Sequence, residues 1–573
     1  MKEYRSTSQI LFGFLPEQTV DLRGKVWKVK EWVDPRAKSV DPATLRQELE
    51  RQLAPWAAAG KDGSYLEQLR RGFAVRFYSL NREGGVRVEK FPQNWVCKVC
   101  NRFYQSLEPS VCQCGCSRFG QLPFVGFHDE CGAISAPYIK PCAAHKQIRI
   151  RFPGTARAEE IRFSCPICDK ILQKGFGFRA CTCGKGRTTF NVHRAASVFS
   201  PRTLAMINPP SSEKVQRIRD AGGASKALSW VLGGLKERTF DELEVTRESF
   251  ASSLLKQGIP KSLVEQMVEQ AIQAGAIGRS SPKVNLGAAK LQEAEKAAVD
   301  IALALVDSRT RIVDMLDRSV PGSDLAGKYQ FGYARGLAKI GLESIEFLDS
   351  FPVATGCYGY TRGPMDAGAS RLVPFRNRQG DYVVYGDVAK TEALFVRLDP
   401  HLIGKWLARA GCQLDAWVDP ASARQSILRA TDIPKPGESV EPTRPGVRLL
   451  TVVHSFAHWF VRQLAVHSGV ERNALSEFLI PQHCSFFIYA ASRGDFVLGG
   501  LQAVFETGLD SLLNELAASD MRCALDPGCL RVGGACVACL HLGETSCRYY
   551  NRFLGRATLT GPDGYLPLVR AAG

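Results

Sequence analysis

The segment CKVCNRFYQSLEPSVCQCG (Cys97–Gly115) places two closely spaced pairs of cysteines on short turns. The segment CPICDKILQKGFGFRACTCG (Cys165–Gly184) repeats the pattern, with C-x2-C followed after twelve residues by C-x-C-G. Two such turns joined by a hairpin can close four thiolates around one tetrahedral zinc ion. The spacing therefore predicts tandem zinc ribbons, with the alternative that these are free structural thiols. The expected ligands are Cys97, Cys100, Cys112 and Cys114 in one ribbon, and Cys165, Cys168, Cys181 and Cys183 in the other.

A mixed cluster lies between the two ribbons: His128-x2-Cys131, and ten residues later Cys142-x2-His145. Ligands two residues apart can face one metal, so these four side chains predict a third site. His128 directly precedes Asp129 and Glu130, which leaves a solvated loop as the alternative for that residue.

A further group of cysteines closes the chain in a segment rich in turn residues. Four ligands suffice for one ion, and we expect Cys529, Cys536, Cys539 and Cys547 to supply them, with Cys523 left over. The remaining cysteines are expected to be buried or spare thiols: Cys116, Cys357, Cys412 and Cys484.

Disulfides are the competing explanation for the 19 cysteines. The first residues are polar, and the apolar stretch at Ile10–Leu15 is too short for a secretory signal, so we expect a reducing, cytoplasmic location. The chain contains no run of 18 apolar residues, which predicts that it does not span a membrane.

The chain is basic, and its positive charge is spread rather than concentrated in a disordered tail. Its 573 residues predict three or four domains, and 74 Lys and Arg against 57 Asp and Glu give a net charge of +17. Such a balance favours a polyanionic partner. Arg and Lys alternate with Phe in the cysteine-rich region, as a DNA-binding surface requires for phosphate contact and stacking, although such Phe residues are more often part of a core.

The residue pattern predicts an α+β multidomain protein. We expect an N-terminal α+β segment (1–90), a tandem zinc-ribbon region (91–210) ending near Pro209-Pro210, a helical insert (211–325), and a C-terminal mixed α/β zinc-binding domain (326–573). Hydrophobic spacing predicts helices at Pro42–Leu53, Ala288–Asp317, His401–Ala410, Leu449–His467 and Leu501–Ser519. It predicts strands at Ser344–Phe347, Tyr358–Arg362, Arg371–Phe375, Tyr382–Val384, Ala393–Leu398 and Ser485–Ala491.

Two motifs suggest catalysis but lack essential residues. Gly322-x4-Gly327-Lys328 has phosphate-loop spacing, but Tyr329 replaces the Ser or Thr that holds Mg²⁺. His454-x3-His458 places two imidazoles on one helical face, but the zinc-protease Glu is missing. The apolar surroundings favour buried, hydrogen-bonded histidines over a metal or catalytic pair. We therefore expect no enzyme.

The C-terminal third resembles a cysteine-bearing domain of unknown function found in MrfA-type DNA helicases and in separate proteins beside a helicase. The residues concerned are Val453–His458, Ile488-Tyr489, Leu498–Gly500, Gly534–Cys539, Glu544–Cys547 and Asn551-Arg552, with Ser344–Thr361 and Glu392–Ile403 upstream. From Arg5-Ser6-x-Ser8-Gln9 to Asn551, the layout resembles the DrmB family of the DISARM anti-phage defence system. That resemblance implies a DrmA-like helicase partner that carries the ATPase, and joint engagement of DNA.

The sequence thus predicts a non-enzymatic, zinc-binding accessory subunit of a DNA helicase complex. The alternative is a metal-dependent nuclease or a divergent NTPase that acts on DNA. No Asp/Glu/His cluster with the spacing of an open metal site is evident in the sequence, which counts against this alternative.

Overall fold

The computed structural model describes the chain except residues 6–9, 12, 156, 209–211, 237–239, 241–246, 274–284, 307, 491–497, 544–545 and 573. Several residues used in the sequence analysis lie outside this described part: Ser6, Ser8, Gln9, Pro209, Pro210, Glu544 and Thr545.

A large, mainly antiparallel sheet forms the centre of the molecule. Its two long strands, β19 (Leu342–Thr361) and β21 (Tyr382–Leu398), pair from Leu342↔Leu398 to Cys357↔Tyr385. β17 (Ser200–Ile207) pairs with β19, while β23 (Ser485–Ala490) and β22 (Leu475–Ile480) extend the sheet beyond β21. The shorter strands are β4 (Arg36–Ala37), β5 (Val75–Ser79), β18 (Arg309–Thr310) and β20 (Val373–Arg376), and β5 pairs parallel to β21.

The two long strands correct the prediction of short, separate strands. Ser344–Phe347 and Tyr358–Arg362 belong to β19, except that Arg362 lies just beyond it, and Tyr382–Val384 and Ala393–Leu398 are the two ends of β21. A register shift between Leu348 and Phe351 lets the exposed Asp349 and Ser350 pass without breaking the pairing. A bulge accommodates polar residues within a strand, so the hydrophobic pattern stops where the strand continues.

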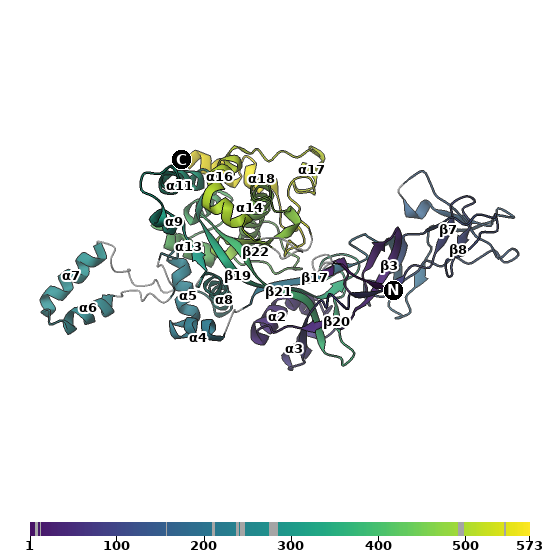
Figure 1. Cartoon of the computed structure of the whole chain (residues 1–573), viewed down its shortest axis with the longest axis horizontal. Coiled ribbons are helices and arrows are strands. Elements are labelled where there is room, and N and C mark those ends of the chain that lie inside the picture. Colours follow the sequence, from purple (N-terminus) through teal and green to yellow (C-terminus); the bar gives the residue numbers. More distant parts are fainter. Residues whose placement is uncertain are drawn as a thin grey trace.

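Both faces of this sheet are covered by helices (Figure 1). Side chains alternate between faces along a strand, so Leu394 and Val396 join one core while Ala393 and Phe395 join another. The first core contains α11 (Tyr333–Lys339), α12 (Pro400–Arg409), α14 (Pro445–Ser468), α16 (Leu509–Ala518), α18 (Arg556–Thr560) and α19 (Tyr565–Ala572). The second contains α4 (Ser212–Asp220), α5 (Gly223–Leu232) and α8 (Ala288–Leu305).

Helix ends follow local rules. α2 (Pro42–Ala58) begins after Asp41, whose carboxylate accepts the Thr44 amide at 2.7 Å, and has Pro42 in its first turn. α14 begins with Pro445 and ends at Gly469, whose φ of 67° suits glycine. Shorter helices elsewhere in the body are α3 (Tyr65–Arg70), α9 (Ile312–Arg318), α10 (Asp324–Gly327), α13 (Pro420–Ala430), α15 (Gly500–Ala503) and α17 (Gly528–Arg531).

The helix expected over Ala288–Asp317 is interrupted. α8 ends at Leu305, β18 adds Arg309 and Thr310 to the central sheet opposite Leu348 and Phe347, and α9 then begins. The sheet contact overrides the local helical pattern, because Arg309 is held by the buried carboxylate of Glu346 at 2.6 Å.

Residues 1–90 are divided between two sheets. β1 (Lys2–Glu3), β6 (Val86–Lys90), β3 (Lys25–Trp32) and β2 (Thr19–Leu22) form a separate four-stranded sheet. β4 and β5 instead join the central sheet, and α2 and α3 pack against it. The N-terminal segment therefore connects the body of the molecule to the cysteine-rich region.

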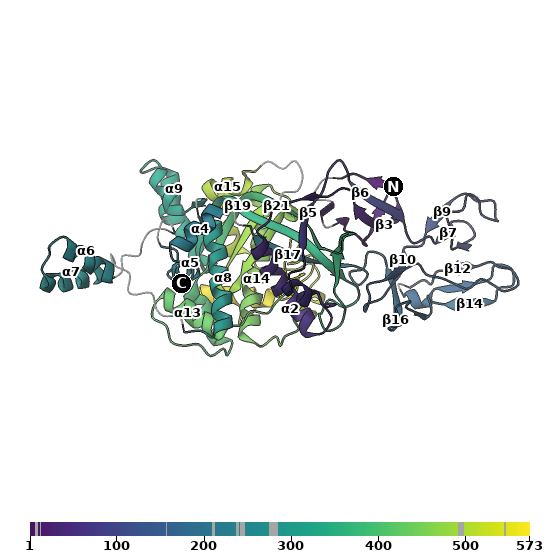
Figure 2. The same ribbon diagram turned by 90° about the horizontal axis from the view of Figure 1, so that it is seen from below.

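The cysteine-rich region projects from one end of the body as an arm, residues 95–194 (Figures 1 and 2). It contains three small sheets: β7 (Trp95–Cys97) with β8 (Phe103–Tyr104) and β9 (Phe119–Gln121), β12 (Arg149–Arg151) with β13 (Arg162–Ser164) and β14 (Ile171–Lys174), and β10 (Phe124–Phe127) with β11 (Ile134–Ser135), β15 (Arg179–Ala180) and β16 (Arg187–Val192). At the opposite end lie α6 (Arg247–Lys256) and α7 (Lys261–Gln273), which pack on each other.

Candidate metal centres

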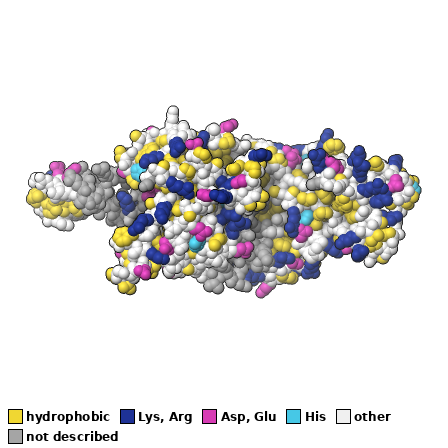
Figure 3. All heavy atoms as spheres, turned by 90° about the horizontal axis from the view of Figure 1, so that it is seen from above, with side chains coloured by type: hydrophobic (Ala, Val, Ile, Leu, Met, Phe, Trp, Pro, Cys, Tyr) yellow, Lys and Arg dark blue, Asp and Glu magenta, His cyan; other side chains and the backbone are white. Residues whose placement is uncertain are grey.

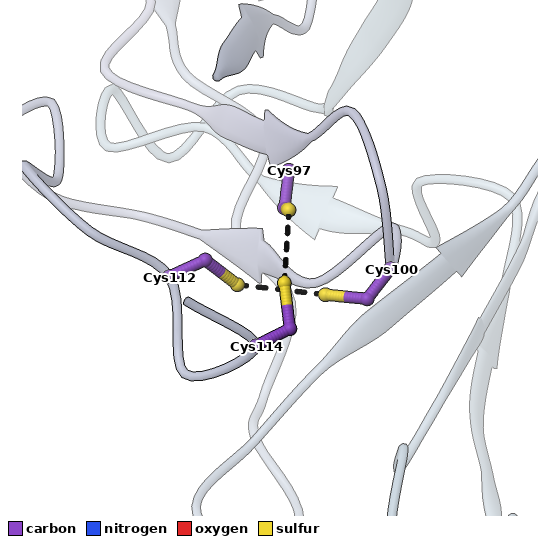
Figure 4. Close-up of side chains that lie close together, drawn as sticks. All are labelled: Cys97, Cys100, Cys112 and Cys114. Atoms are coloured by element: carbon purple, nitrogen blue, oxygen red, sulfur yellow. Dashed lines mark hydrogen bonds between the residues drawn. The ribbon is translucent and has the colours of Figure 1, made fainter. Parts of the chain in front are cut away.

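The first predicted ribbon forms as expected. Cys97, at the end of β7, and Cys100 converge with Cys112 and Cys114 from the next turn (Figure 4). The Cys97 and Cys114 sulfurs lie 3.6 Å apart, and those of Cys100 and Cys112 lie 3.4 Å apart. Four sulfurs at about 2.3 Å from a tetrahedral zinc ion are separated by about 3.8 Å, so this set fits the ion.

Neighbouring polar groups favour the thiolate form of one cysteine in this cluster, Cys100. The Arg102 guanidinium donates to Cys100 Sγ at 3.4 Å, and the Tyr104 hydroxyl donates to Cys112 Sγ at 3.2 Å. Burial raises the pKa of Cys100, but hydrogen bonds from the backbone and side chain of Arg102 outweigh it and lower the pKa to about 6. Cys100 therefore favours the thiolate, which is the form that ligates a metal.

The ligands expected for the second ribbon and for the mixed cluster also form two four-ligand groups, but each group combines one ligand pair from the expected ribbon with one from the expected mixed cluster. Cys165 and Cys168 face Cys142 and His145, with Sγ of Cys165 at 3.5 Å from Nδ1 of His145. Cys181 and Cys183 face His128 and Cys131 instead. In that set the sulfurs of Cys131 and Cys181 are 3.5 Å apart, and Cys183 Sγ lies 3.5 Å from His128 Nδ1.

Strand pairing explains this correction. β10 pairs antiparallel with β16, from Phe124↔Val192 to Phe127↔Thr189, which brings His128 beside the turn that carries Cys181 and Cys183. β12 pairs with β13 at Arg149↔Ser164, which brings the Cys142–His145 turn beside Cys165. The 142–168 cluster is therefore nested within the 128–183 cluster. His128 is buried, so the solvated-loop alternative for it is wrong.

The terminal cluster contains Cys523 in place of Cys547. Sulfurs of Cys523 and Cys536 lie 3.5 Å apart, and Cys539 Sγ is 3.7 Å from both Cys529 and Cys536. Sequence spacing could not decide between the two candidates, because neither Cys523 nor Cys547 lies in a short-spaced pair. Cys547 lies elsewhere, fully buried beside the helix that carries His454 and His458.

The other cysteines stand apart from these four-ligand groups. Cys116 accepts the Arg118 amide at 3.2 Å, and Cys357, Cys412 and Cys484 are buried. Burial raises the pKa of Cys357 and of Cys484 to about 12, so these thiols stay protonated, unlike Cys100.

The phosphate-loop lookalike is helical. Gly327 ends α10, and Lys328–Gly332 form a π-helical turn that continues into α11. Lys328 Nζ lies 3.0 Å from Asp510 Oδ2, and the Tyr329 hydroxyl donates to the Glu506 carbonyl at 2.7 Å. A phosphate loop requires a strand, a glycine-rich turn and a helix, whereas α9 precedes this segment.

Together the fold and the clusters define a multidomain α+β protein with several Cys/His modules of the kind that bind zinc, as the sequence predicted. Among the described residues, no helix has both the length and the apolar character needed to cross a membrane.

Comparison with known proteins gives two partial matches. Residues 6–203 match a domain of unknown function (DUF8724), a range that includes β2, β3 and β6 of the N-terminal sheet, the arm and the start of β17. A stretch of 183 residues is 27% identical to the DISARM protein DrmB of Bacillus paralicheniformis and covers 29% of this chain and 31% of that protein. The chain thus aligns with about a third of this relative and is similar to it at a distance. The resemblance of the C-terminal third to MrfA-type helicases stays a prediction.

Proposed function

We propose that this chain is a zinc-stabilised, non-enzymatic subunit of a DISARM-like defence complex, and that its arm binds DNA held by a partner helicase. Each of the four cysteine-rich clusters binds one zinc ion in this proposal. The similarity to DISARM protein DrmB supports the defence role. The observation that carries the DNA-binding role is the charge of the projecting arm.

The arm concentrates positive charge. Residues 95–194 contain 15 Lys and Arg against six Asp and Glu, so the arm's net charge of +9 is more than half of the chain's +17. Figure 3 shows Lys and Arg side chains spread over the visible face of the arm, at the end of the molecule opposite α6 and α7. Thirteen of the basic residues are exposed: Lys98, Arg118, Lys140, Lys146, Arg151, Arg157, Arg162, Lys170, Lys174, Arg179, Lys185, Arg187 and Arg194. Such a surface attracts the phosphates of DNA, and this attraction does not depend on the base sequence.

Exposed aromatic rings lie among these charges. Phe178 is 88% exposed, and the Arg187 guanidinium lies 4.8 Å from the centre of its ring. Phe152 is exposed just after β12, whereas Phe163 and Phe176 belong to the small core of the arm. A ring flanked by Arg is suited to stack on an unpaired base. The arm therefore favours single-stranded DNA or DNA ends over a fully paired duplex.

Zinc would give the arm its rigidity. The largest apolar cluster in the arm consists of nine buried residues with four others packed on it, shared among short strands. Such a core is too small to order a hundred residues without further cross-links. Three closed ligand sets supply those cross-links.

A salt titration of DNA binding tests the proposal. We would compare the wild-type chain with K170E/K174E/K185E in the arm and with the matched control R318E/R335E/K405E, whose three residues are exposed on the body. Each lost phosphate contact lowers the slope of log K against log salt by about 0.7 to 0.9. The slope for the arm variant should therefore fall by about two to three units if all three residues contact phosphates, and the slope for the control should match wild type.

A second variant separates stacking from charge. Phe178→Ala should weaken binding to tailed DNA about fivefold or more and leave the salt slope unchanged, because base stacking contributes about 1–3 kcal/mol. Equal slopes for the arm and body variants, alone and with a helicase partner, would remove the arm from the DNA path. DNA cleavage or ATP hydrolysis by the chain alone would instead support the enzymatic alternative.

A further inference from the structure

Four more metal-ligating side chains converge in the core of the body, away from the arm. His454 and His458 project from one face of α14, one turn apart, Glu477 comes from β22, and Cys547 comes from the segment before α18. Each is at most 2% exposed. The apolar surroundings in the sequence favoured buried, hydrogen-bonded histidines, and Glu477 belongs to no sequence motif.

The contacts are short and share one centre. His454 Nε2 lies 3.0 Å from His458 Nε2, 3.2 Å from Cys547 Sγ and 3.1 Å from Glu477 Oε1. His458 Nε2 lies 3.3 Å from Glu477 Oε2. Bonds of about 2.0–2.3 Å to a tetrahedral ion separate such ligands by about 3.3–3.6 Å, so the four atoms are already close to a coordination shell.

Hydrogen bonding fixes which atoms face the centre. His458 Nδ1 lies 2.8 Å from the Leu540 carbonyl, so Nδ1 carries the proton and Nε2 presents a lone pair. The backbone amide of Asn551 donates to Cys547 Sγ at 3.1 Å. A carbonyl behind a histidine and an amide behind a sulfur are the supports that metal ligands use to hold their orientation.

The close charged partners of the Glu477 carboxylate are the two histidines of the cluster itself. Within the described part of the chain, neither oxygen of Glu477 receives a hydrogen bond, although both are fully buried. Burying a carboxylate is costly unless it is paired or coordinates a metal. Because Nε2 of His458 presents a lone pair, it cannot donate to Glu477 Oε2 at 3.3 Å, so two hydrogen-bond acceptors face each other across the cluster. A cation between them resolves the conflict.

We propose that His454, His458, Glu477 and Cys547 bind one zinc ion as a fifth, structural site. All four positions come from the protein, which leaves no open position for catalysis, and the mixed nitrogen, oxygen and sulfur set suits Zn²⁺. The site joins α14 to β22 and to the segment carrying the terminal cysteine cluster. Leu540, whose carbonyl orients His458, directly follows Cys539 of that cluster.

Anomalous diffraction at the zinc edge tests the assignment on the wild-type chain, so no variant needs to fold. Five peaks are expected, one of them between His454, His458, Glu477 and Cys547. Four peaks at the cysteine-rich clusters with none at this position would overturn the proposal. The cysteine-rich sites are scored separately in the same map, so their occupancy does not affect the conclusion.

Metal analysis of variants gives an independent measurement. Cys547→Ser should lower the zinc content of the folded chain from five to four per molecule. The control Cys484→Ser removes a thiol of similar burial that lies outside the clusters and should keep five. Cobalt substitution provides the second readout, because C547S should remove one thiolate-to-cobalt absorption contribution. An unchanged zinc content and an unchanged cobalt absorption spectrum in folded C547S would refute the site.

Discussion

A buried carboxylate holds the two ends of the chain together, and its removal should be costly. Glu48, on α2, is 1% exposed and forms an ion pair with Arg548, 500 residues away. Arg51 Nε lies 3.3 Å from its Oε2, Gln52 donates to Oε1 at 2.8 Å, and Lys296 Nζ lies 3.9 Å away. Glu48→Gln keeps the volume but leaves Arg548 buried without its counter-charge.

The expected loss follows from the cost of an unpaired buried charge. Breaking a buried pair by removing one partner costs about 3–5 kcal/mol, and the retained amide places this change near 3 kcal/mol. If a unit of roughly 300 residues unfolds together, the midpoint should fall by about 5 °C. The control is Glu67→Gln, which breaks an exposed ion pair with Arg71 and should cost well under about 1 kcal/mol.

The same pair predicts a pH dependence. Burial raises the pKa of Glu48, but the charges of Arg51, Arg548 and Lys296 outweigh it and hold the pKa far below its usual value. A lowered folded-state pKa stabilises the fold above the unfolded-state pKa of about 4.3. The difference between wild type and E48Q should therefore be constant above about pH 5 and shrink by about 1.4 kcal/mol per pH unit below about pH 4.

Differential scanning calorimetry of wild type, E48Q and E67Q across this range measures both effects. Equal midpoints for E48Q and E67Q at pH 7 would show that the buried pair contributes no net stability. A difference between wild type and E48Q that grows on acidification would refute the sign of the argument.

The nested clusters predict a specific pattern of zinc loss. Cys131→Ser and Cys181→Ser should each remove one zinc ion and together still remove one, whereas Cys165→Ser combined with Cys181→Ser should remove two; the reverse pattern in elemental analysis would restore the sequential pairing. Lys328→Ala should leave the ATPase rate of a reconstituted helicase complex unchanged and cost under about 1 kcal/mol of stability, because Lys328 forms a partly exposed pair with Asp510. A collapse of turnover in folded K328A would revive nucleotide binding at that segment.

Local chemistry let the sequence predict the ligands in short pairs and many of the helices. A C-x2-C or C-x2-H pair on a tight turn points both side chains at one metal whatever surrounds it. α14 was expected at Leu449–His467 and spans Pro445–Ser468. It could be predicted because its apolar spacing and the following Gly469 are properties of the segment itself. The strands were harder, since β19 and β21 continue through polar residues that only their partner strand supports.

The partner of each ligand pair was decided by tertiary structure. Four pairs between His128 and Cys183 can combine in three ways, and the registers of β10 with β16 and β12 with β13 select the nested one. Cys547, which was expected in the terminal cluster, lies in a core site instead. There it contacts His454, 93 residues earlier in the sequence, near Glu477, which belongs to no motif. Sequence spacing records which side chains share a turn, whereas a closed metal site also needs contacts between distant segments, and these are set by strand register and packing.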